Sequence, residues 1–206
     1  MATWTTRAQI GSAPAELRLP WPEVDRSTHR LKDVRFVASP NFDDRPDPAD
    51  ISLLVIHSIS LPPAQFGGSF IEKFFTNKLD PAAHPYFETI RELKVSAHCV
   101  IDRAGVVTQY VPFDRRAWHA GESRFDERGR CNDFSIGIEL EGNDDQPFTD
   151  AQYVHLARVT RALLLAYPKI TPARIAGHSD IAPGRKTDPG PHFDWDGFLL
   201  RLEYPR

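Results

Sequence analysis

The sequence predicts an α/β (α+β) fold, a single domain in which a central mixed β-sheet is flanked by helices. Three stretches support this prediction. Residues 51–57 form a nearly unbroken apolar run, which is typical of a central strand covered on both faces. Residues 135–142 alternate between large apolar side chains and small or acidic ones, as a β-strand does. Residues 150–167 carry an apolar stripe at helical spacing.

Size and charge narrow the class of protein. The chain has 206 residues, of which 41% are hydrophobic and 26% are charged, enough to bury the core of one globular domain. Its formal net charge is −3 and its Lys and Arg residues form no run, which favours a small ligand over nucleic acid or a membrane. No stretch has the pattern of a secretory signal or a membrane span, so we expect a cytoplasmic protein. Cys99 and Cys131 are interpreted as reduced thiols rather than a disulfide.

The amino-terminal part contains a boundary and a predicted helix. Residues 1–35 lack periodicity and are interpreted as an extension that lies on the domain or is partly mobile, so the domain itself spans residues 36–206. Residues 68–78 predict an amphipathic helix whose apolar positions are Phe70, Ile71, Phe74 and Phe75.

The middle of the chain predicts a hairpin, and the hairpin makes the sheet mixed. Residues 95–102 and 106–111 are apolar stretches joined by a short turn that contains Gly105. Residues 113–133 are irregular and highly charged, and a connection of that length is usually a functional loop. The next strand places Ile136, Ile138 and Leu140 on one face and Gly137, Glu139 and Glu141 on the other.

Two helices are predicted in the carboxyl-terminal part. Thr149 and Gln152 form a capping box for the helix over residues 150–167, and Pro168 ends it. Residues 194–202 predict a closing helix.

Residues 175–195 predict the functional segment of the chain. His178 follows a short apolar strand, where a rigid sheet continues into a loop. Prolines and glycines on both sides of Asp188 favour a loop that doubles back and brings this acid near His178. Lys186 lies two residues before Asp188, so an extended backbone would place both side chains on one face.

Two histidines at strand ends and one carboxylate match the three-ligand zinc site of a hydrolase, in which a water takes the fourth position. The candidate ligands for one Zn²⁺ per chain are His57, His178 and Asp188. The alternative is that each is a hydrogen-bonded surface residue, because the chain has no short H-x-x-x-H pattern and Asp180 competes for the acid position.

Glu139 and Lys186 are the candidate catalytic residues. Glu139 faces away from three large aliphatic side chains, so it looks either into a polar cleft or into solvent. In a cleft, Glu139 could take a proton from the attacking water and return it to the leaving amine, while Lys186 stabilises the oxyanion. The alternative for Lys186 is an ordinary exposed lysine.

Three further side chains are candidates for substrate contacts. Trp118 and His119 could stack on and bind a sugar ring, or they could be a packed aromatic and a satisfied histidine. Arg130 could bind a carboxylate with its guanidinium fork, although a surface ion pair is the commoner role of an arginine.

Five blocks along the chain resemble the zinc-dependent N-acetylmuramoyl-L-alanine amidases: LLVIHSISLPP, VSAHCVIDRAG, YVPFDRRAWHAGES, CNDFSIGIELEG and GHSDIAPGRKTDPGP. The resemblance runs from about residue 38 to about residue 200, and the DPGP context of Asp188 is similar to the branch that acts on 1,6-anhydro-muropeptides. It implies a mixed sheet flanked by helices and zinc on His57, His178 and Asp188. It also implies that Glu139 is the acid/base residue and Lys186 the transition-state stabiliser.

The same resemblance implies a substrate. This is a small anhydro-muropeptide of cytoplasmic peptidoglycan recycling, cut between the lactyl group of the anhydromuramoyl sugar and L-alanine. Arg130 corresponds to an arginine that meets carboxylates of the stem peptide. Lys94 stands where relatives tend to have arginine, which keeps the charge and loses the bidentate geometry. We expect a monomer without a nucleic-acid or membrane partner.

Two other functions compete with this one. A module that binds muropeptides without cutting them would lack a ligand or the acid, whereas this chain keeps His57, His178, Asp188, Glu139 and Lys186. An envelope amidase that acts on intact cell wall would require export, which the amino-terminal sequence does not favour.

Overall fold

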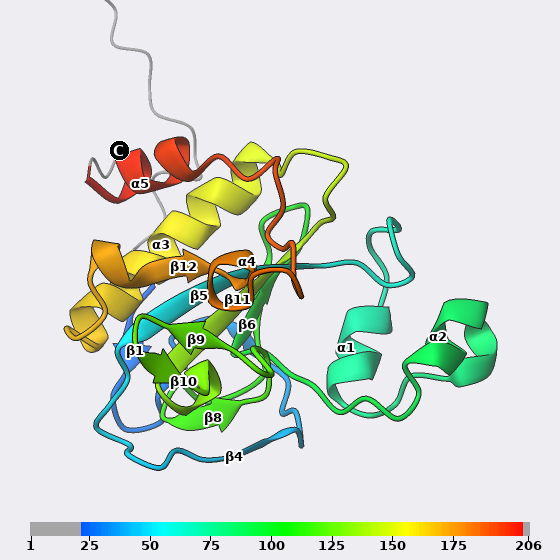
Figure 1. The fold of residues 1–206 in the computed structure, drawn as a ribbon, viewed down its shortest axis with the longest axis horizontal. Helices are drawn as coiled ribbons and strands as arrows, with labels where there is room; N and C mark the ends of the chain where they lie inside the picture. The colour runs from blue at the N-terminus through cyan, green and yellow to red at the C-terminus, as the bar shows by residue number, and fades with distance from the viewer. Residues whose placement is uncertain (1–21, 204–206) are drawn as a thin grey trace, which may run out of the picture.

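The computed structural model describes residues 22–203, and its centre is a six-stranded mixed sheet (Figure 1). The strand order is β12 (Ile175–Gly177), β5 (Leu53–Ile59), β11 (Ser135–Glu141), β6 (Cys99–Ile101), β7 (Val107–Gln109) and β3 (Arg35–Phe36). The first four strands in this order are mutually parallel. β7 runs antiparallel to β6 as the predicted hairpin, and β3 lies parallel to β7. The predicted mixed sheet is confirmed.

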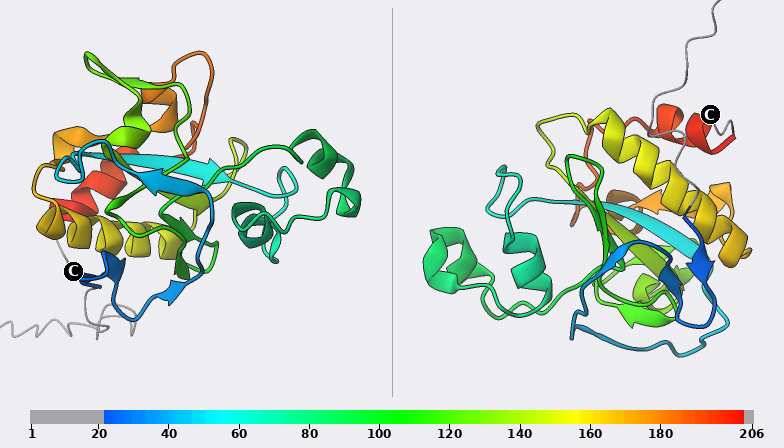
Figure 2. Two further views of the ribbon diagram at one scale, coloured as in Figure 1. Left: turned by 90° about the horizontal axis from the view of Figure 1, so that it is seen from below. Right: turned by 180° about the vertical axis from the view of Figure 1, so that it is seen from behind.

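Two helices cover one face of the sheet (Figure 2). The longer one, α3 (Asp150–Ala166), begins at the predicted capping box, in which Thr149 and Gln152 satisfy each other's backbone N–H groups. α5 (Trp195–Glu203) packs beside it at the end of the described chain. Apolar side chains of β5, β11 and β6 form one core with α3, and this core includes Leu54, Ile56, Ile136, Ile138, Leu140, Leu156 and Leu163. The predicted inward face of residues 135–142 is therefore confirmed.

The opposite face of the sheet is also covered, by a segment that the sequence predicted to be irregular. This segment contains short strands instead: β8 (Arg115–Ala117), β9 (Arg124–Phe125), β10 (Arg128–Gly129) and the 3₁₀ turn η3 (Cys131–Asp133). β8 pairs with β4 (Phe42–Asp44), and β9 pairs with β10. Strands of two or three residues are too short to show a period, which is why the prediction missed them.

A small helical lobe follows β5 and projects beside the sheet (Figure 1). It consists of α1 (Phe70–Phe75), η2 (Pro81–Ala83) and α2 (Pro85–Thr89). The predicted helix over residues 68–78 is therefore too long. Gly67 and Gly68 have φ angles of 82° and 81°, which a helix does not allow, and Asn77 ends the segment with a φ of 58°.

Residues 22–36 lie on the domain. β1 (Val24–Asp25) and β2 (Arg30–Leu31) form a hairpin, and β3 adds the last strand to the sheet. Leu31 is buried, and its N–H donates to Oε1 of Gln109 at 2.8 Å. The earlier part of the predicted extension, residues 1–21, falls outside the described residues.

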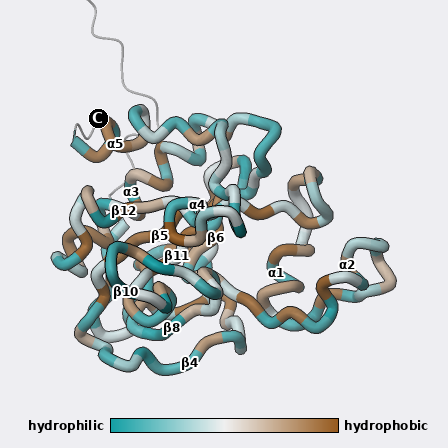
Figure 3. Tube along the Cα trace, in the orientation of Figure 1, coloured by the Kyte–Doolittle hydropathy of each residue, from teal (hydrophilic) through white to brown (hydrophobic). Residues whose placement is uncertain are grey.

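Hydropathy follows this architecture. Figure 3 shows hydrophobic stretches around β5 and β11, with hydrophilic stretches on the outer loops. Within residues 22–203, no helix has the length and apolar character needed to cross a membrane.

Candidate metal centre

The parallel register brings the predicted functional side chains to one edge of the sheet. His57 on β5 lies directly opposite Glu139 on β11. Gly177, the last residue of β12, pairs with Ile56, so His178 follows at the level of His57. His178 then begins α4 (His178–Ile181). Ligands of open α/β sheets bind at the carboxyl ends of parallel strands, and the three side chains gather at this end.

His57, His178 and Asp188 converge on one point. Nδ1 of His57 lies 3.0 Å from Nδ1 of His178 and 3.1 Å from Oδ2 of Asp188. Nδ1 of His178 lies 3.0 Å from the same Oδ2. A tetrahedral zinc ion with ligands at 2.0–2.1 Å requires ligand atoms about 3.3 Å apart. The three atoms therefore have the spacing of one face of such a site, and the group could hold a metal ion.

The other ring nitrogens of the two histidines support the same interpretation. Nε2 of His178 lies 3.0 Å from the carbonyl of Ala120. A carbonyl only accepts, so Nε2 carries the proton and Nδ1 of neutral His178 presents a bare lone pair to the cluster. Nε2 of His57 lies 2.9 Å from Nδ1 of His119. Metal-ligating histidines are usually held in this way through their second nitrogen.

Electrostatics keep the cluster in the protonation state that a cation needs. Burial lowers the pKa of His57 to about 4, so this imidazole is neutral near pH 7. Burial raises the pKa of Asp188, but the close contacts of its carboxylate with the rings of His178 and His57 outweigh burial and leave this pKa below its usual value. Two imidazoles and one carboxylate are a donor set that suits zinc.

Asp180 does not compete for the ligand position. Its Oδ2 accepts the backbone N–H of Gly177 at 2.7 Å and so caps the start of α4. Asp188 reaches the cluster because its backbone carbonyl accepts the N–H of Ser179 at 2.8 Å, which ties the returning loop to the first turn of α4.

Two glycines allow this close packing. A Cβ on Gly177 would lie 2.8 Å from Cδ of Pro189, next to Asp188. A Cβ on Gly137 would lie 2.5 to 2.8 Å from the ring of His119. A glycine lets another group approach the backbone closely, and at Gly137 the approaching group is the ring of His119.

Glu139 is buried rather than placed on a solvated sheet face. It is 9% exposed, and within the described residues its buried Oε2 has no hydrogen-bond partner. Burial raises its pKa well above the usual range, the charge of Asp188 adds to this, and Lys186 opposes it. A carboxyl group with a free buried oxygen beside a potential metal site is suited to exchange protons with a ligand.

Lys186 is exposed on the loop between His178 and Asp188. Its positive charge acts on both His57 and Glu139, which places the ammonium group on the side of the cluster. The neighbouring Arg185 anchors this loop, because its guanidinium donates to the carbonyls of Ala120, at 2.7 Å, and Glu122.

The structure separates the roles of Trp118 and His119. Both ring nitrogens of His119 have protein partners, Nδ1 at His57 and Nε2 at Oγ of Ser135, 3.2 Å away. These contacts favour the satisfied histidine over a sugar contact. Trp118 is half-buried, and its indole N–H donates to Oδ1 of Asp43 at 3.2 Å.

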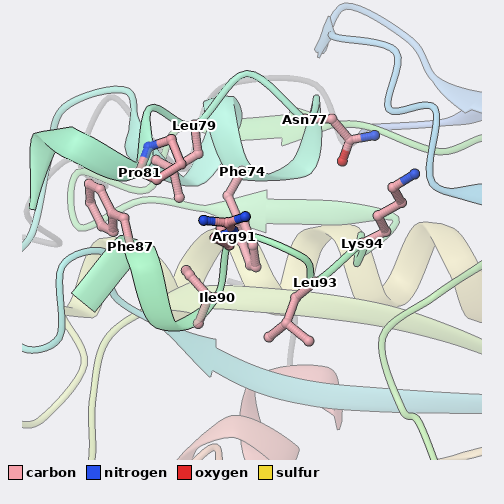
Figure 4. A pocket seen from close by; sticks show the side chains of 9 residues that line it. All are labelled: Phe74, Asn77, Leu79, Pro81, Phe87, Ile90, Arg91, Leu93 and Lys94. Atoms are coloured by element: carbon pink, nitrogen blue, oxygen red, sulfur yellow. The ribbon is translucent and has the colours of Figure 1, made fainter. Parts of the chain in front are cut away.

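Arg130 and Lys94 are both exposed. Nε of Arg130 forms an ion pair with Oδ2 of Asp133 at 3.2 Å. Lys94 lies at the edge of a cavity in the helical lobe, lined mainly by Phe74, Leu79, Pro81, Phe87, Ile90 and Leu93. Figure 4 shows its ammonium group directed away from Phe87 and Pro81. The structure thus places Lys94 by the helical lobe, whereas the cluster of His57, His178 and Asp188 lies at the edge of the sheet.

The sequence analysis missed two residues that build the site. Oδ1 of Asn132 accepts the N–H groups of His119, at 3.2 Å, and Ala120, at 2.8 Å. Asn132 stands in the 3₁₀ turn before β11, and nothing local marks it. The buried guanidinium of Arg45 donates to the carbonyls of Asn132, Asp133, Phe113 and Ser135. A turn-rich sequence gives no signal for a buried arginine.

The fold and the cluster agree with a sequence comparison. The family pattern described as N-acetylmuramoyl-L-alanine amidase matches residues 47–191, more than half of the chain. The chain therefore belongs to the N-acetylmuramoyl-L-alanine amidase family.

Individual relatives are more specific. The chain is 60% identical over 173 residues to the 1,6-anhydro-N-acetylmuramyl-L-alanine amidase AmpD of Haemophilus influenzae, which covers 84% of this chain and 94% of that protein. A crystal structure of a selenomethionine derivative of AmpD superimposes with a TM-score of 0.82 at 58% identity, covering 84% of this chain and 96% of the other.

A more distant structure carries a ligand. It is the Escherichia coli amidase AmiD in complex with anhydro-N-acetylmuramic acid-L-Ala-D-γ-Glu-L-Lys. It is 27% identical, has a TM-score of 0.55 and covers 88% of this chain and 65% of that one.

Proposed function

We propose that this protein hydrolyses the amide bond between the lactyl group of 1,6-anhydro-N-acetylmuramic acid and L-alanine of the stem peptide, in cytoplasmic peptidoglycan recycling. The observation that carries the proposal is the triangle of His57, His178 and Asp188 with the buried Glu139 beside it. The family and the 60% identity to an AmpD amidase support the substrate class. The proposal treats residues 36–206 as the catalytic domain and the protein as a monomer.

We further propose zinc as the resident metal, held by Nδ1 of His57, Nδ1 of His178 and Oδ2 of Asp188. When bound, zinc would supply a Lewis acid that polarises the amide carbonyl and lowers the pKa of water. His119 and the carbonyl of Ala120 hold the two imidazoles with their lone pairs on the metal side.

Glu139 moves the proton in this proposal. Burial shifts the pKa of Glu139 upward, toward pH 7. A carboxyl group with a pKa near the working pH can both take up a proton and give it back efficiently. It takes the proton from the attacking water and returns it to the nitrogen of L-alanine as the carbon–nitrogen bond breaks. The unpartnered Oε2 is the atom available for this exchange.

The remaining roles concern substrate. Lys186 stabilises the negative charge that develops on the carbonyl oxygen. Its exposed ammonium group is near enough for its charge to influence the pKa of both Glu139 and His57. Arg130 binds carboxylates of the stem peptide, Trp118 lies against the sugar, and Lys94 supplies an outer positive charge.

One experiment tests the reaction and the metal together. The protein is incubated with anhydro-muramoyl peptide and with its hydrated counterpart, each with and without a chelator, and the products are weighed by mass spectrometry. We expect release of intact stem peptide from the anhydro substrate, loss of cleavage with chelator, and recovery with added zinc. Cleavage by metal-free protein would refute the zinc assignment, and no cleavage of either substrate by the zinc-loaded protein would refute the function.

A further inference from the structure

An ion network connects two of the proposed substrate contacts through residues that have no assigned role. Its centre is Arg116 on β8. Nε of Arg116 donates to Oδ1 of Asp43 at 2.6 Å, and Nη2 donates to Oδ2 of the same carboxylate. The third nitrogen, Nη1, donates to Oδ1 of Asp133 at 2.6 Å. One guanidinium therefore holds two carboxylates in fixed places, with the bidentate geometry that makes such pairs specific.

Each carboxylate holds one outer residue in turn. Asp43 accepts the indole N–H of Trp118 at 3.2 Å, and the free oxygen of Asp133 lies 3.2 Å from Nε of Arg130. The network thus runs from Trp118 through Asp43, Arg116 and Asp133 to Arg130. Its charges sum to zero, because two aspartates balance two arginines.

Arg130 is held from one side only. Asp133 engages Nε, and within residues 22–203 neither Nη1 nor Nη2 of Arg130 forms a hydrogen bond. The side chain is 75% exposed. Its backbone is fixed as well, with a φ of 61° and hydrogen bonds on both its N–H and its carbonyl. The free edge of the guanidinium is therefore an anchored, outward fork that matches a carboxylate.

The fork is joined to the candidate metal centre through the backbone. Asn132 lies between Arg130 and Asp133, and its side chain holds the N–H groups of His119 and Ala120. His119 contacts His57, and Ala120 contacts His178. The turn that carries the network therefore also positions the ligand-supporting segment.

We propose that Arg116 and Asp133 are positioning residues for substrate recognition, which hold the free edge of Arg130 toward a carboxylate of the stem peptide. The inference rests on the proposed function and extends it to two residues without an assigned role. Arg116 fixes the position of the Asp133 carboxylate. Asp133 in turn fixes the guanidinium of Arg130 and balances its positive charge. A single guanidinium on an exposed turn would otherwise sample many rotamers and would lose entropy on binding.

The register of β4 and β8 provides a matched control. Asp43 pairs with Arg116, and the next pair on the same ladder is Asp44 with Arg115. Nη1 of Arg115 contacts Asp44 on the exposed side, so this pair has the same chemistry and the same strands. It has no contact with Trp118, Asp133 or Arg130 among the described residues. Arg115→Gln therefore removes the neighbouring, more exposed Arg–Asp ion pair of the same ladder without touching the network.

The test compares zinc-loaded wild type, Arg116→Gln, Asp133→Asn and Arg115→Gln on the anhydromuramoyl tripeptide. We expect KM to rise about tenfold in the first two variants, the scale of one charge-assisted hydrogen bond, with the change in KM rather than in kcat. Arg115→Gln should keep the KM of the wild type. Arg116→Lys should recover part of the loss, because lysine restores the charge without the bidentate contact.

A double-variant cycle shows whether the effect passes through Arg130. Adding Arg116→Gln to Arg130→Gln should raise KM less than about twofold further, because the positioned group is already gone. Thermal unfolding and zinc content of every variant are measured alongside. Equal KM values for Arg116→Gln and Arg115→Gln in an active enzyme would overturn the inference alone. Full additivity in the cycle would do the same, whereas an inactive wild type would overturn the proposed function.

Discussion

Glu139 and His57 lie opposite each other on two parallel strands, so the proposed proton carrier has a fixed position relative to a proposed ligand. Glu139 itself supplies no ligand atom to the cluster. We predict that Glu139→Ala retains zinc and lowers turnover by about a hundredfold or more, because general acid–base catalysis contributes at that scale. Zinc content and kcat are measured on the same sample. Full turnover in this variant would remove Glu139 from the mechanism.

His119 contacts Nε2 of His57 and therefore orients a proposed metal ligand. We predict that His119→Ala lowers zinc affinity by about ten- to a hundredfold, because a partner that orients a ligating imidazole typically contributes this much. A competition titration with a chromogenic chelator measures the affinity. His84→Ala is the control, since His84 caps α2 through its side chain and lies outside the cluster. Equal affinities in the two variants would contradict the role of His119.

Sequence alone predicted the three side chains that cluster in the structure, but not the residues that support them. His57 and His178 end apolar runs, and proline and glycine flank Asp188, so each carried a local signal. The contact between His57 and His119 joins residues 62 positions apart and depends on how a loop folds back over the sheet. No pattern within a short window records such a contact. The same holds for Asn132, whose amide acts on a segment of the loop rather than on its own turn.

At the level of secondary-structure elements, the packing of His119 against β11 requires a glycine at position 137. We predict that Gly137→Ala destabilises the protein by about 1–3 kcal/mol and weakens zinc binding, because the added Cβ would lie 2.5 Å from the His119 ring. Urea unfolding and a zinc titration measure the two effects. Gly129→Ala is the matched control, because the nearest atom to its Cβ, the carbonyl oxygen of Ser123, would be 3.8 Å away. A Gly137→Ala protein as stable as this control would show that the loop yields.

The elements that the sequence predicted well are those with local signals. The capping box of α3 and the alternating pattern of β11 each depend on only a few consecutive residues. The strand pair β4 and β8 is not, because Asp43 and Arg116 are 73 positions apart and each strand has only three residues. Helix α1 was overestimated because its apolar positions, which all lie within Phe70–Phe75, do not mark where the helix begins and ends, whereas the positive φ angles of Gly68 and Asn77 do.

On the scale of the whole molecule, buried histidines link stability to pH. Burial and the charge of Arg45 lower the pKa of His98 from 6.5 to about 3. Between these values the unfolded chain binds a proton that the folded protein does not. Stability should therefore fall as pH falls through this window, by about 1.4 kcal/mol per pH unit for this group. Above pH 6.5 the effect vanishes.

Urea unfolding of metal-free protein between pH 7 and pH 4 measures this dependence. We predict a shallower loss of stability in His98→Gln than in the wild type, because the substituted side chain does not titrate. The slopes are compared rather than the absolute stabilities, since the variant also loses the hydrogen bond from the N–H of Gly137 to His98. Parallel slopes would rule out His98 as a source of the pH dependence.

The ligand atoms of the candidate centre come from opposite ends of the described chain, since His57 precedes His178 by 121 positions and Asp188 by 131. During synthesis on the ribosome, β5, β11 and the hairpin can emerge and pair before the third ligand has been translated. The nascent protein therefore cannot complete this coordination site until residue 188 has left the exit tunnel. Capture of the ion would follow the translation of all three side chains, and a chain truncated before residue 188 would lack one of the candidate ligands.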